Sequence, residues 1–215
     1  MQKHGAHTEG PRIFLSELGW REFARYTLYH LPQLPFENLS PKFSGMRWRN
    51  SAADLKAWQR GQTGVPIVDA GMRQLWQTGW MHNMARMIVG SFLTKHLLID
   101  WKEGEAWFRD TLVDADFANN AMNWQWVAGT GIEATPFFRI FNPTRQAEKF
   151  DPDGDYIRQW VPELRRLSGK TLFEPWAAKE ADLRQGGVIL GKTYPRPIVD
   201  LKDGRDRALQ AFRAL

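Results

Sequence analysis

The chain has 215 residues, with 11 tryptophans, no cysteine and a formal net charge of +5 at pH 7. That length is enough for one domain with a sizeable core. The lack of cysteine excludes disulfides, cysteine-ligated zinc and thiol chemistry, and no apolar run is long enough to span a membrane. The N-terminal segment also lacks the apolar core of a signal peptide. We therefore expect a cytoplasmic protein, whose mild basic excess does not by itself identify a partner.

The first predicted element is a long helix. Residues 1–11 are expected to form a disordered lead-in, and helical spacing of apolar residues then continues over 12–31. Within this helix Glu17, Trp20 and Arg21 lie three and four residues apart, so they share one face. A surface ion pair beside a half-buried Trp explains that spacing as well as a binding site does.

The next elements are shorter. Residues 32–53 contain three prolines and mixed charge, so an ordered loop is expected there. A short helix is predicted over 54–60. A further helix should have Pro66 in its first turn and stop at Gly79, because proline is tolerated at a helix start and glycine favours a helix end.

The helix predicted over 80–98 is the most informative one. Its polar stripe carries an amide, a guanidinium, a thioether and a glycine, from Asn83, Arg86, Met87 and Gly90. A buried stripe of this composition needs a polar neighbour. The guanidinium of Arg86 in particular needs a carboxylate, which Asp114 or Asp116 would supply.

The stretch DADFANNAMNWQW, residues 114–126, combines two carboxylates, three asparagines and two tryptophans. Polar groups interleaved with large aromatics suit a pocket for a flat ligand that is rich in heteroatoms. A capped helix start, with Asp114 or Asp116 as the N-cap, explains the composition equally well. The two aspartates are two residues apart, so they should point in different directions and not act as an acid–base pair.

Helices predicted over 101–113, 155–160 and 203–215 complete the pattern, and no segment alternates with the period of a strand. We therefore expect an all-α fold with no sheet. The histidines do not have metal-ligand spacing, so no metal is expected. Neither a nucleophile elbow nor a phosphate-binding glycine loop is present, which leaves hydrolase and kinase functions without support.

Seven motifs together resemble one family. They are SELGWREF at 16–23, TGVPIVDAGMRQL at 63–75, TGWMHNMARMI at 78–88, LLIDWKEGE at 97–105, DADFANN at 114–120, NWQWVAGTG at 123–131 and FFRIFNPTRQAEKFD at 137–151. In a single register over 12–213, the sequence resembles the C-terminal FAD-binding helical domain of the photolyase/cryptochrome family. It is most similar to class I cyclobutane pyrimidine dimer photolyases. The resemblance implies that 12–215 form a multi-helical FAD-binding and catalytic domain.

The resemblance implies FAD as cofactor and UV-damaged DNA containing pyrimidine dimers as partner, with no membrane and a monomeric protein. Reduced FAD transfers an electron in light to a flipped-out dimer in such enzymes, and Asn120 falls beside flavin N5. The implied cofactor contacts are Phe14, Arg21, Asn83, Arg86, Asp114, Ala115, Asp116 and Asn120. The residues implied in catalysis are Glu17, Trp20, Asn83, Met87, Asn120 and Trp126.

The DNA-facing positions implied by the resemblance are Glu17, Trp20, Arg21, Asn83, Met87, Trp126, Arg139 and Gln146. A relay of tryptophans that photoreduces the flavin would use Trp48, Trp101 and Trp124. The family's N-terminal antenna domain and the Ser/Thr-rich loop that binds the cofactor phosphates have no counterpart in the chain, so a fragment is expected. Three hypotheses follow: part of a dimer photolyase, a cryptochrome-like blue-light photoreceptor without repair, and an inactive truncated remnant.

Overall fold

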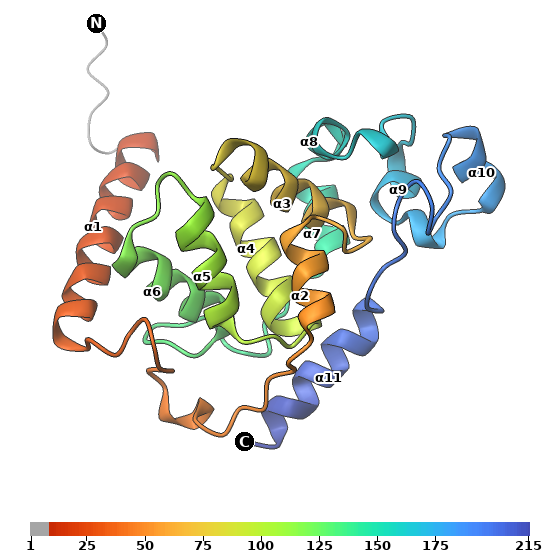
Figure 1. The fold of residues 1–215 in the computed structure, drawn as a ribbon. Coiled ribbons are helices and arrows are strands. Elements are labelled where there is room, and N and C mark those ends of the chain that lie inside the picture. The colour runs from red at the N-terminus through yellow and green to blue at the C-terminus, as the bar shows by residue number, and fades with distance from the viewer. Residues whose placement is uncertain (1–8) are drawn as a thin grey trace, which may run out of the picture.

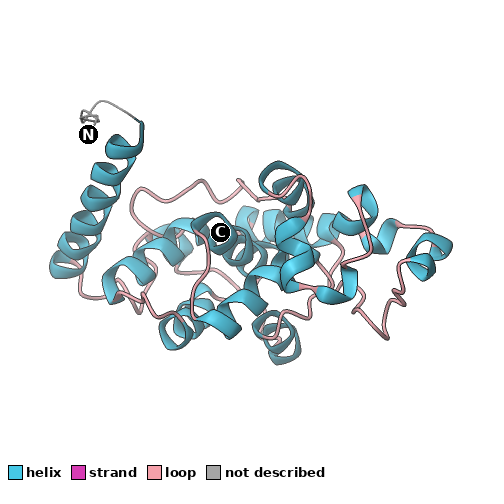
Figure 2. Ribbon diagram, turned by 90° about the horizontal axis from the view of Figure 1, so that it is seen from above, coloured by secondary structure: helices cyan, strands magenta, loops and turns pink. Residues whose placement is uncertain are grey.

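The computed structural model describes residues 9–215, which form helices and loops (Figures 1 and 2). Within this range there is no strand, only an isolated bridge between Leu190 and Tyr194, so the expected all-α fold is confirmed. Most of the expected lead-in lies outside the described residues. Its last part is helical, because α1 already begins at Glu9, and the expected start at residue 12 is therefore wrong.

The helical elements, in chain order, are α1 Glu9–His30, η1 Pro41–Phe43, α2 Ala52–Gln59, α3 Pro66–Thr78, α4 Asn83–Ser91, η2 Phe92–His96, α5 Trp101–Thr111, α6 Phe117–Ala128, α7 Pro143–Phe150, α8 Asp155–Trp160, η3 Pro162–Leu164, α9 Gly169–Phe173, η4 Pro175–Ala177, α10 Glu180–Gln185 and α11 Leu201–Arg213. Most are α-helices, and η2 is a π-helical turn. None of the helices between residues 9 and 215 is long and apolar enough to cross a membrane.

Local chemistry fixes the ends of α3 as predicted. Pro66 occupies the first turn, and Gly79 ends the helix in the left-handed conformation with φ 67°. The helix predicted over 80–98 begins later and ends earlier than expected, because the helical segment runs from Asn83 to His96. His82 is extended and its side chain caps α4 by accepting the Met84 N–H, so the helix begins only at Asn83. Beyond Ser91 the helix continues as η2 with wider π-type turns.

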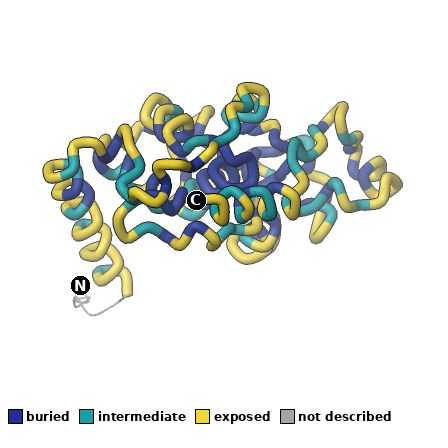
Figure 3. The backbone as a smooth tube through the Cα atoms, turned by 90° about the horizontal axis from the view of Figure 1, so that it is seen from below, coloured by how far each residue is buried: buried dark blue, intermediate teal, exposed yellow. Residues whose placement is uncertain are grey.

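The main core lies where α3, α4 and η2 meet α5 and α6, and it appears as the dark blue centre of Figure 3. By contrast, α1 buries only Ala24 and Thr27 and leaves large apolar side chains in solvent. Figure 2 shows it projecting from the body of the molecule, which it contacts through α6. Phe14 on this helix is 63% exposed.

A buried carboxylate ties the start of α3 to the C-terminal part of the chain. Asp69 has no exposed surface, and it accepts hydrogen bonds from the Thr63 N–H at 2.7 Å, the Gly64 N–H at 3.0 Å and the Tyr194 hydroxyl at 2.6 Å. The Thr63 hydroxyl donates a further bond at 2.7 Å. Such a charge is tolerated in the core because its oxygens are surrounded by donors.

Replacing Asp69 with asparagine is expected to lower the free energy of unfolding by about 2 kcal/mol, because the amide N–H₂ faces donors that it cannot accept from. Urea unfolding monitored by circular dichroism measures the change. Asp182→Asn on the exposed face of α10 is the control, since its carboxylate is in solvent. Equal stability of the two variants would contradict the assigned role of Asp69.

Candidate functional site

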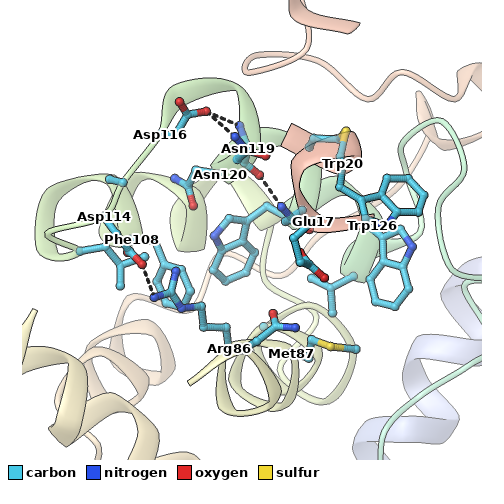
Figure 4. A pocket seen from close by; sticks show the side chains of 18 of the residues that line it. Glu17, Trp20, Arg86, Met87, Phe108, Asp114, Asp116, Asn119, Asn120 and Trp126 are labelled. Atoms are coloured by element: carbon cyan, nitrogen blue, oxygen red, sulfur yellow. Dashed lines mark hydrogen bonds and ion pairs between the residues drawn. The ribbon is translucent and has the colours of Figure 1, made fainter. Parts of the chain in front are cut away.

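A cavity of about 380 Å³ opens between α1, α4, α5 and α6 (Figure 4). This volume lies in the range of about 300–1,000 Å³ that is usual for small-molecule sites. Eleven of the residues proposed from the sequence line it: Glu17, Trp20, Asn83, Arg86, Met87, Asp114, Ala115, Asp116, Asn120, Trp124 and Trp126. The helices α1, α4 and α6 and the segment 114–116 thus bring most of the expected residues to one place.

An ion pair between Arg86 and Asp114 lies at one end of the cavity. Nη2 of Arg86 on α4 lies 2.8 Å from Oδ2 of Asp114, and its Nε donates to the Met81 carbonyl at 2.7 Å. The predicted need of Arg86 for a carboxylate is therefore confirmed, with Asp114 as the partner. The two bonds fix the plane of the guanidinium, and its Nη1 makes no hydrogen bond to residues 9–215. The pair presents a fixed donor and a positive charge to a ligand.

Asp116 is the N-cap of α6. Its Oδ1 accepts the Asn119 N–H at 2.9 Å, and its Oδ2 lies 3.4 Å from Nη2 of Arg25 on α1. The hydrogen bond from the Asn119 backbone lowers the pKa of the Asp116 carboxyl below its usual value. Asp114 and Asp116 thus have separate partners, as the predicted divergence of their side chains requires. Asp116 both caps the helix and lines the cavity, so both interpretations of the stretch hold in part.

The side chain of Asn120 is held in one orientation. Its Nδ2 donates to the Glu105 carbonyl at 3.0 Å and to Glu105 Oε1 at 2.9 Å, so both amide hydrogens are used on α5. Oδ1 of Asn120 accepts no hydrogen bond from the described residues and remains available as an acceptor in the cavity wall. The Glu105 side chain is 3% exposed, and burial raises the pKa of its carboxyl, an effect that Arg109 at 3.3 Å opposes.

Aromatic rings form the floor of the cavity. The Phe108 and Trp124 rings lie 4.9 Å apart edge to face, and Trp58 stands behind both. This packing requires a glycine on α5, because a Cβ on Gly104 would lie 2.1 Å from Cη2 of Trp124. An apolar aromatic floor below polar walls suits a planar ring system with heteroatoms on its edge.

The mouth is built by α1 and by the end of α6. Glu17 and Trp20 reach it from α1, and Trp126 comes from α6. In Figure 4 these indoles lie on the opposite side of the cavity from Asp114. Ile132 and Glu133, in the loop that follows α6, complete the rim. We call the segment 129–136 the rim loop.

Some proposed residues lie elsewhere. The positions outside the cavity lining are Phe14, Arg21, Trp48, Trp101, Arg139 and Gln146. Arg21 pairs with its neighbour Glu22 at 3.2 Å. Trp101 is fully buried, and its Nε1 donates to Asn38 Oδ1 at 2.8 Å. Arg139 is exposed, with its guanidinium 5.7 Å from the Phe141 ring centroid. The cavity contacts expected for Phe14 and Arg21 are therefore not made here.

Several residues that line the cavity were not proposed as site residues from the sequence: Phe23, Phe108, Asn119, Asn123, Val127, Ile132 and Glu133. Glu105, which bonds Asn120 from outside the lining, was not proposed either. Glu105 is the most important omission, because it orients Asn120. It is the last residue of the motif LLIDWKEGE, and that position was the signal that was available. No cluster of potential metal ligands occurs among the described residues.

The cavity of this helical fold contains a fixed cation, a free amide oxygen and an aromatic floor. These features are typical of a domain that binds a planar, polar cofactor. The family model described as "FAD binding domain of DNA photolyase" matches residues 14–214. The chain belongs to this family, whose cofactor is FAD.

Three similar proteins show the range of the family. A deoxyribodipyrimidine photo-lyase of Agrobacterium fabrum is 57% identical over 215 residues, which are 100% of this chain and 45% of the relative. A crystal structure of a bacterial class III photolyase from Agrobacterium tumefaciens has a TM-score of 0.94 and 56% identity, covering 99% of this chain and 45% of that one. A Synechocystis cryptochrome has a TM-score of 0.91 and 36% identity, covering 98% of this chain and 43% of its own.

The chain spans about half the length of the curated relatives it matches. The Agrobacterium tumefaciens structure is that of a class III photolyase, whereas the motifs of this chain resemble class I. The FAD-binding part of the family is thus the part that the chain shares with these proteins.

Proposed function

We propose that the cavity binds the isoalloxazine ring of FAD, and that the protein acts in DNA repair as a deoxyribodipyrimidine photolyase. The observation that carries the proposal is the set of oriented polar groups around an aromatic floor: the Arg86 guanidinium, held by Asp114, and the free Oδ1 of Asn120. The family resemblance of the motifs implies the same two residues as cofactor contacts.

The residues present fit the ring of the cofactor. FAD, when bound and reduced, supplies the photoexcited electron that splits the cyclobutane ring of a pyrimidine dimer. Arg86 would keep positive charge beside the anionic reduced ring, and Asn120 Oδ1 would accept the hydrogen on flavin N5. Asp116 and the main chain at Ala115 would face the polar edge. Asn83, whose amide lines the same wall on α4, would bond either the ring or the dimer.

The mouth of the cavity suits the second ligand. A flipped-out base needs flat surfaces to pack against and polar groups to bond its edge. Trp20 and Trp126 would provide the surfaces, Glu17 the hydrogen bond, and Met87 an apolar contact. Arg139 and Gln146, outside the cavity, would face the DNA backbone. Trp124, Trp101 and Trp48 would carry electrons from the surface to the flavin, and the repair protein would act as a monomer.

Flavin absorption of the purified chain tests the cofactor assignment. Among residues 9–215, Arg86 is the one Lys or Arg that lines the cavity, so this part of the chain offers the two phosphates of FAD no further cation there. Riboflavin and FAD should therefore bind the chain with similar affinity, and both spectra should shift on binding. Fluorescence quenching of either flavin gives the dissociation constant. A chain that binds neither flavin would refute the assignment of the cavity.

Glu17→Ala, made in the full-length protein, is expected to reduce dimer repair about 10- to 100-fold, because one hydrogen bond to the dimer is lost. The flavin content should stay unchanged. Glu22→Ala is a matched control on the same helix, since Glu22 bonds Arg21 and does not line the cavity. Loss of flavin from the Glu17 variant would move this residue from the substrate to the cofactor.

A blue-light photoreceptor is the second candidate, and the similarity to the Synechocystis cryptochrome favours it. Both functions would use the same flavin cavity, so binding of FAD does not separate them. A light-dependent assay of dimer loss from irradiated DNA does, with the full-length protein. Repair supports the photolyase, whereas flavin photoreduction without dimer loss supports the photoreceptor.

A further inference from the structure

A lysine with no exposed surface lies behind the cavity, in η2. Nζ of Lys95 donates to the Ala128 carbonyl at 2.6 Å and lies 3.4 Å from the centroid of the Phe137 ring. Full burial of a lysine is rare, because removing the ammonium from water is costly unless it is paired. No carboxylate is within salt-bridge distance of Lys95 in the described part of the chain. The buried amine is therefore held by contacts other than a salt bridge.

The amine of Lys95 contacts the C-terminal end of α6, at the Ala128 carbonyl, and the face of the Phe137 ring. Ala128 is the last residue of α6, where carbonyl groups lack partners within the helix and carry partial negative charge. An amine at this end satisfies one of those carbonyls, and the face of Phe137 is favourable for a cation. Burial lowers the pKa of Lys95 well below its ordinary value, and the neutral amine can still donate the same hydrogen bond.

The two contacts stand on either side of the rim loop. Ala128 ends the helix that presents Asn120, Trp124 and Trp126 to the cavity, and Phe137 follows directly after the rim loop. Phe137 is in turn stacked on Phe212 of α11, with ring centroids 5.1 Å apart. One buried amine therefore connects the two ends of a segment whose middle carries the cavity rim.

We propose that Lys95 is a positioning residue: its amine fixes the end of α6 to the far end of the rim loop, and so sets the shape of the cavity mouth. This role concerns the protein wall and holds whichever ligand the cavity takes. A lysine that merely fills the core would serve equally well with a methyl group in place of its amine.

The absence of cysteine from the chain allows that comparison to be made directly. Lys95→Cys introduces a single thiol, which is alkylated in denaturant with 2-bromoethylamine or with 1-bromopropane before refolding. The two products have side chains of the same length as lysine and differ only in an amine against a methyl group. Amide hydrogen exchange, read by mass spectrometry on peptides covering 126–136 and 155–173, reports the two regions separately.

The aminoethyl protein is expected to protect 126–136 as the parent chain does. In the propyl protein exchange there should rise about 10-fold or more, the effect of losing a buried hydrogen bond and leaving the Ala128 carbonyl without its donor, while 155–173 stays unchanged. Equal exchange in the two proteins, or a rise spread over both regions, would overturn the proposal. Flavin binding is not needed for this readout, so failure of the flavin assignment is distinguishable.

A second variant covers failure of refolding. Lys95→Met, which needs no alkylation or refolding, keeps a long unbranched side chain without the amine, and it should raise exchange selectively in 126–136. Leu172→Ala in α9 is the control for general destabilisation, because this fully buried residue lies in the part of the core around α8 and α9. If both variants loosen the rim loop to the same degree, the proposed role of Lys95 is wrong.

Discussion

Arg86→Met is expected to weaken the binding of riboflavin and of FAD about 10- to 100-fold. Methionine retains much of the apolar stem but removes the positive charge and the free Nη1 donor. It also leaves Asp114 without its partner at 2.8 Å, which adds negative charge beside a ring that becomes anionic on reduction. Titration of each flavin by fluorescence quenching measures the loss.

Two control variants test whether the loss of flavin affinity is specific to Arg86. Arg184→Met removes an arginine from the exposed face of α10, where it pairs with Glu180, and should not affect flavin affinity. Asp114→Asn should weaken binding less than Arg86→Met, because the guanidinium retains its bond to the Met81 carbonyl. Unchanged affinity in the Arg86 variant would remove this residue from the cofactor site.

Gly104→Ala is expected to destabilise the fold by about 3 kcal/mol and to distort the cavity floor. The new methyl group would lie 2.1 Å from Cη2 of Trp124 and 2.7 Å from Cδ2 of Leu93, so the indole must move toward the cavity. Urea unfolding gives the loss of stability, and near-ultraviolet circular dichroism reports the changed environment of the indole.

Gly19→Ala is the matched control, since Gly19 is also helical and a Cβ there meets no atom within 4 Å. This substitution should be neutral or stabilising by up to about 1 kcal/mol, because alanine favours helices. If Gly104→Ala behaves in the same way, the close approach of α5 to Trp124 is not required for the fold.

Two kinds of feature could be predicted from the sequence: helix ends that have a local cause, and a charged side chain whose burial requires a partner. Pro66 and Gly79 define the ends of α3 by backbone chemistry alone. The Arg86–Asp114 pair could be predicted across 28 residues because a guanidinium in a stripe expected to be buried needs a carboxylate, and only two candidates lay in a suitable stretch. In the structure the stripe is only partly buried, with Asn83 exposed. Burial cost, rather than spacing, carried that inference.

The parts that could not be predicted depend on packing. Glu105 lies in WKEGEAWFRD, which has the appearance of a partly exposed amphipathic helix, and it becomes buried only because Gly104 lets α6 approach. The change from α4 to η2 has no local signal either, since FLTKH continues an apolar helical pattern. Phe14 and Arg21 share α1 with Glu17, yet the way α1 leans on α6 admits only some of its residues to the cavity.

The helices on the two sides of the cavity differ in how much of their surface is buried. Arg86, Asn120 and Trp124 stand on helices embedded in the main core, whereas Glu17 and Trp20 stand on α1, which buries only two of its residues. Local opening is easiest where little apolar surface is buried, so amide hydrogens in α1 of this chain should exchange faster than those in α4 and α6. A ring bound against α4 and α6 would keep its contacts when α1 opens locally, whereas a larger ligand that rests on Glu17 and Trp20 would lose them.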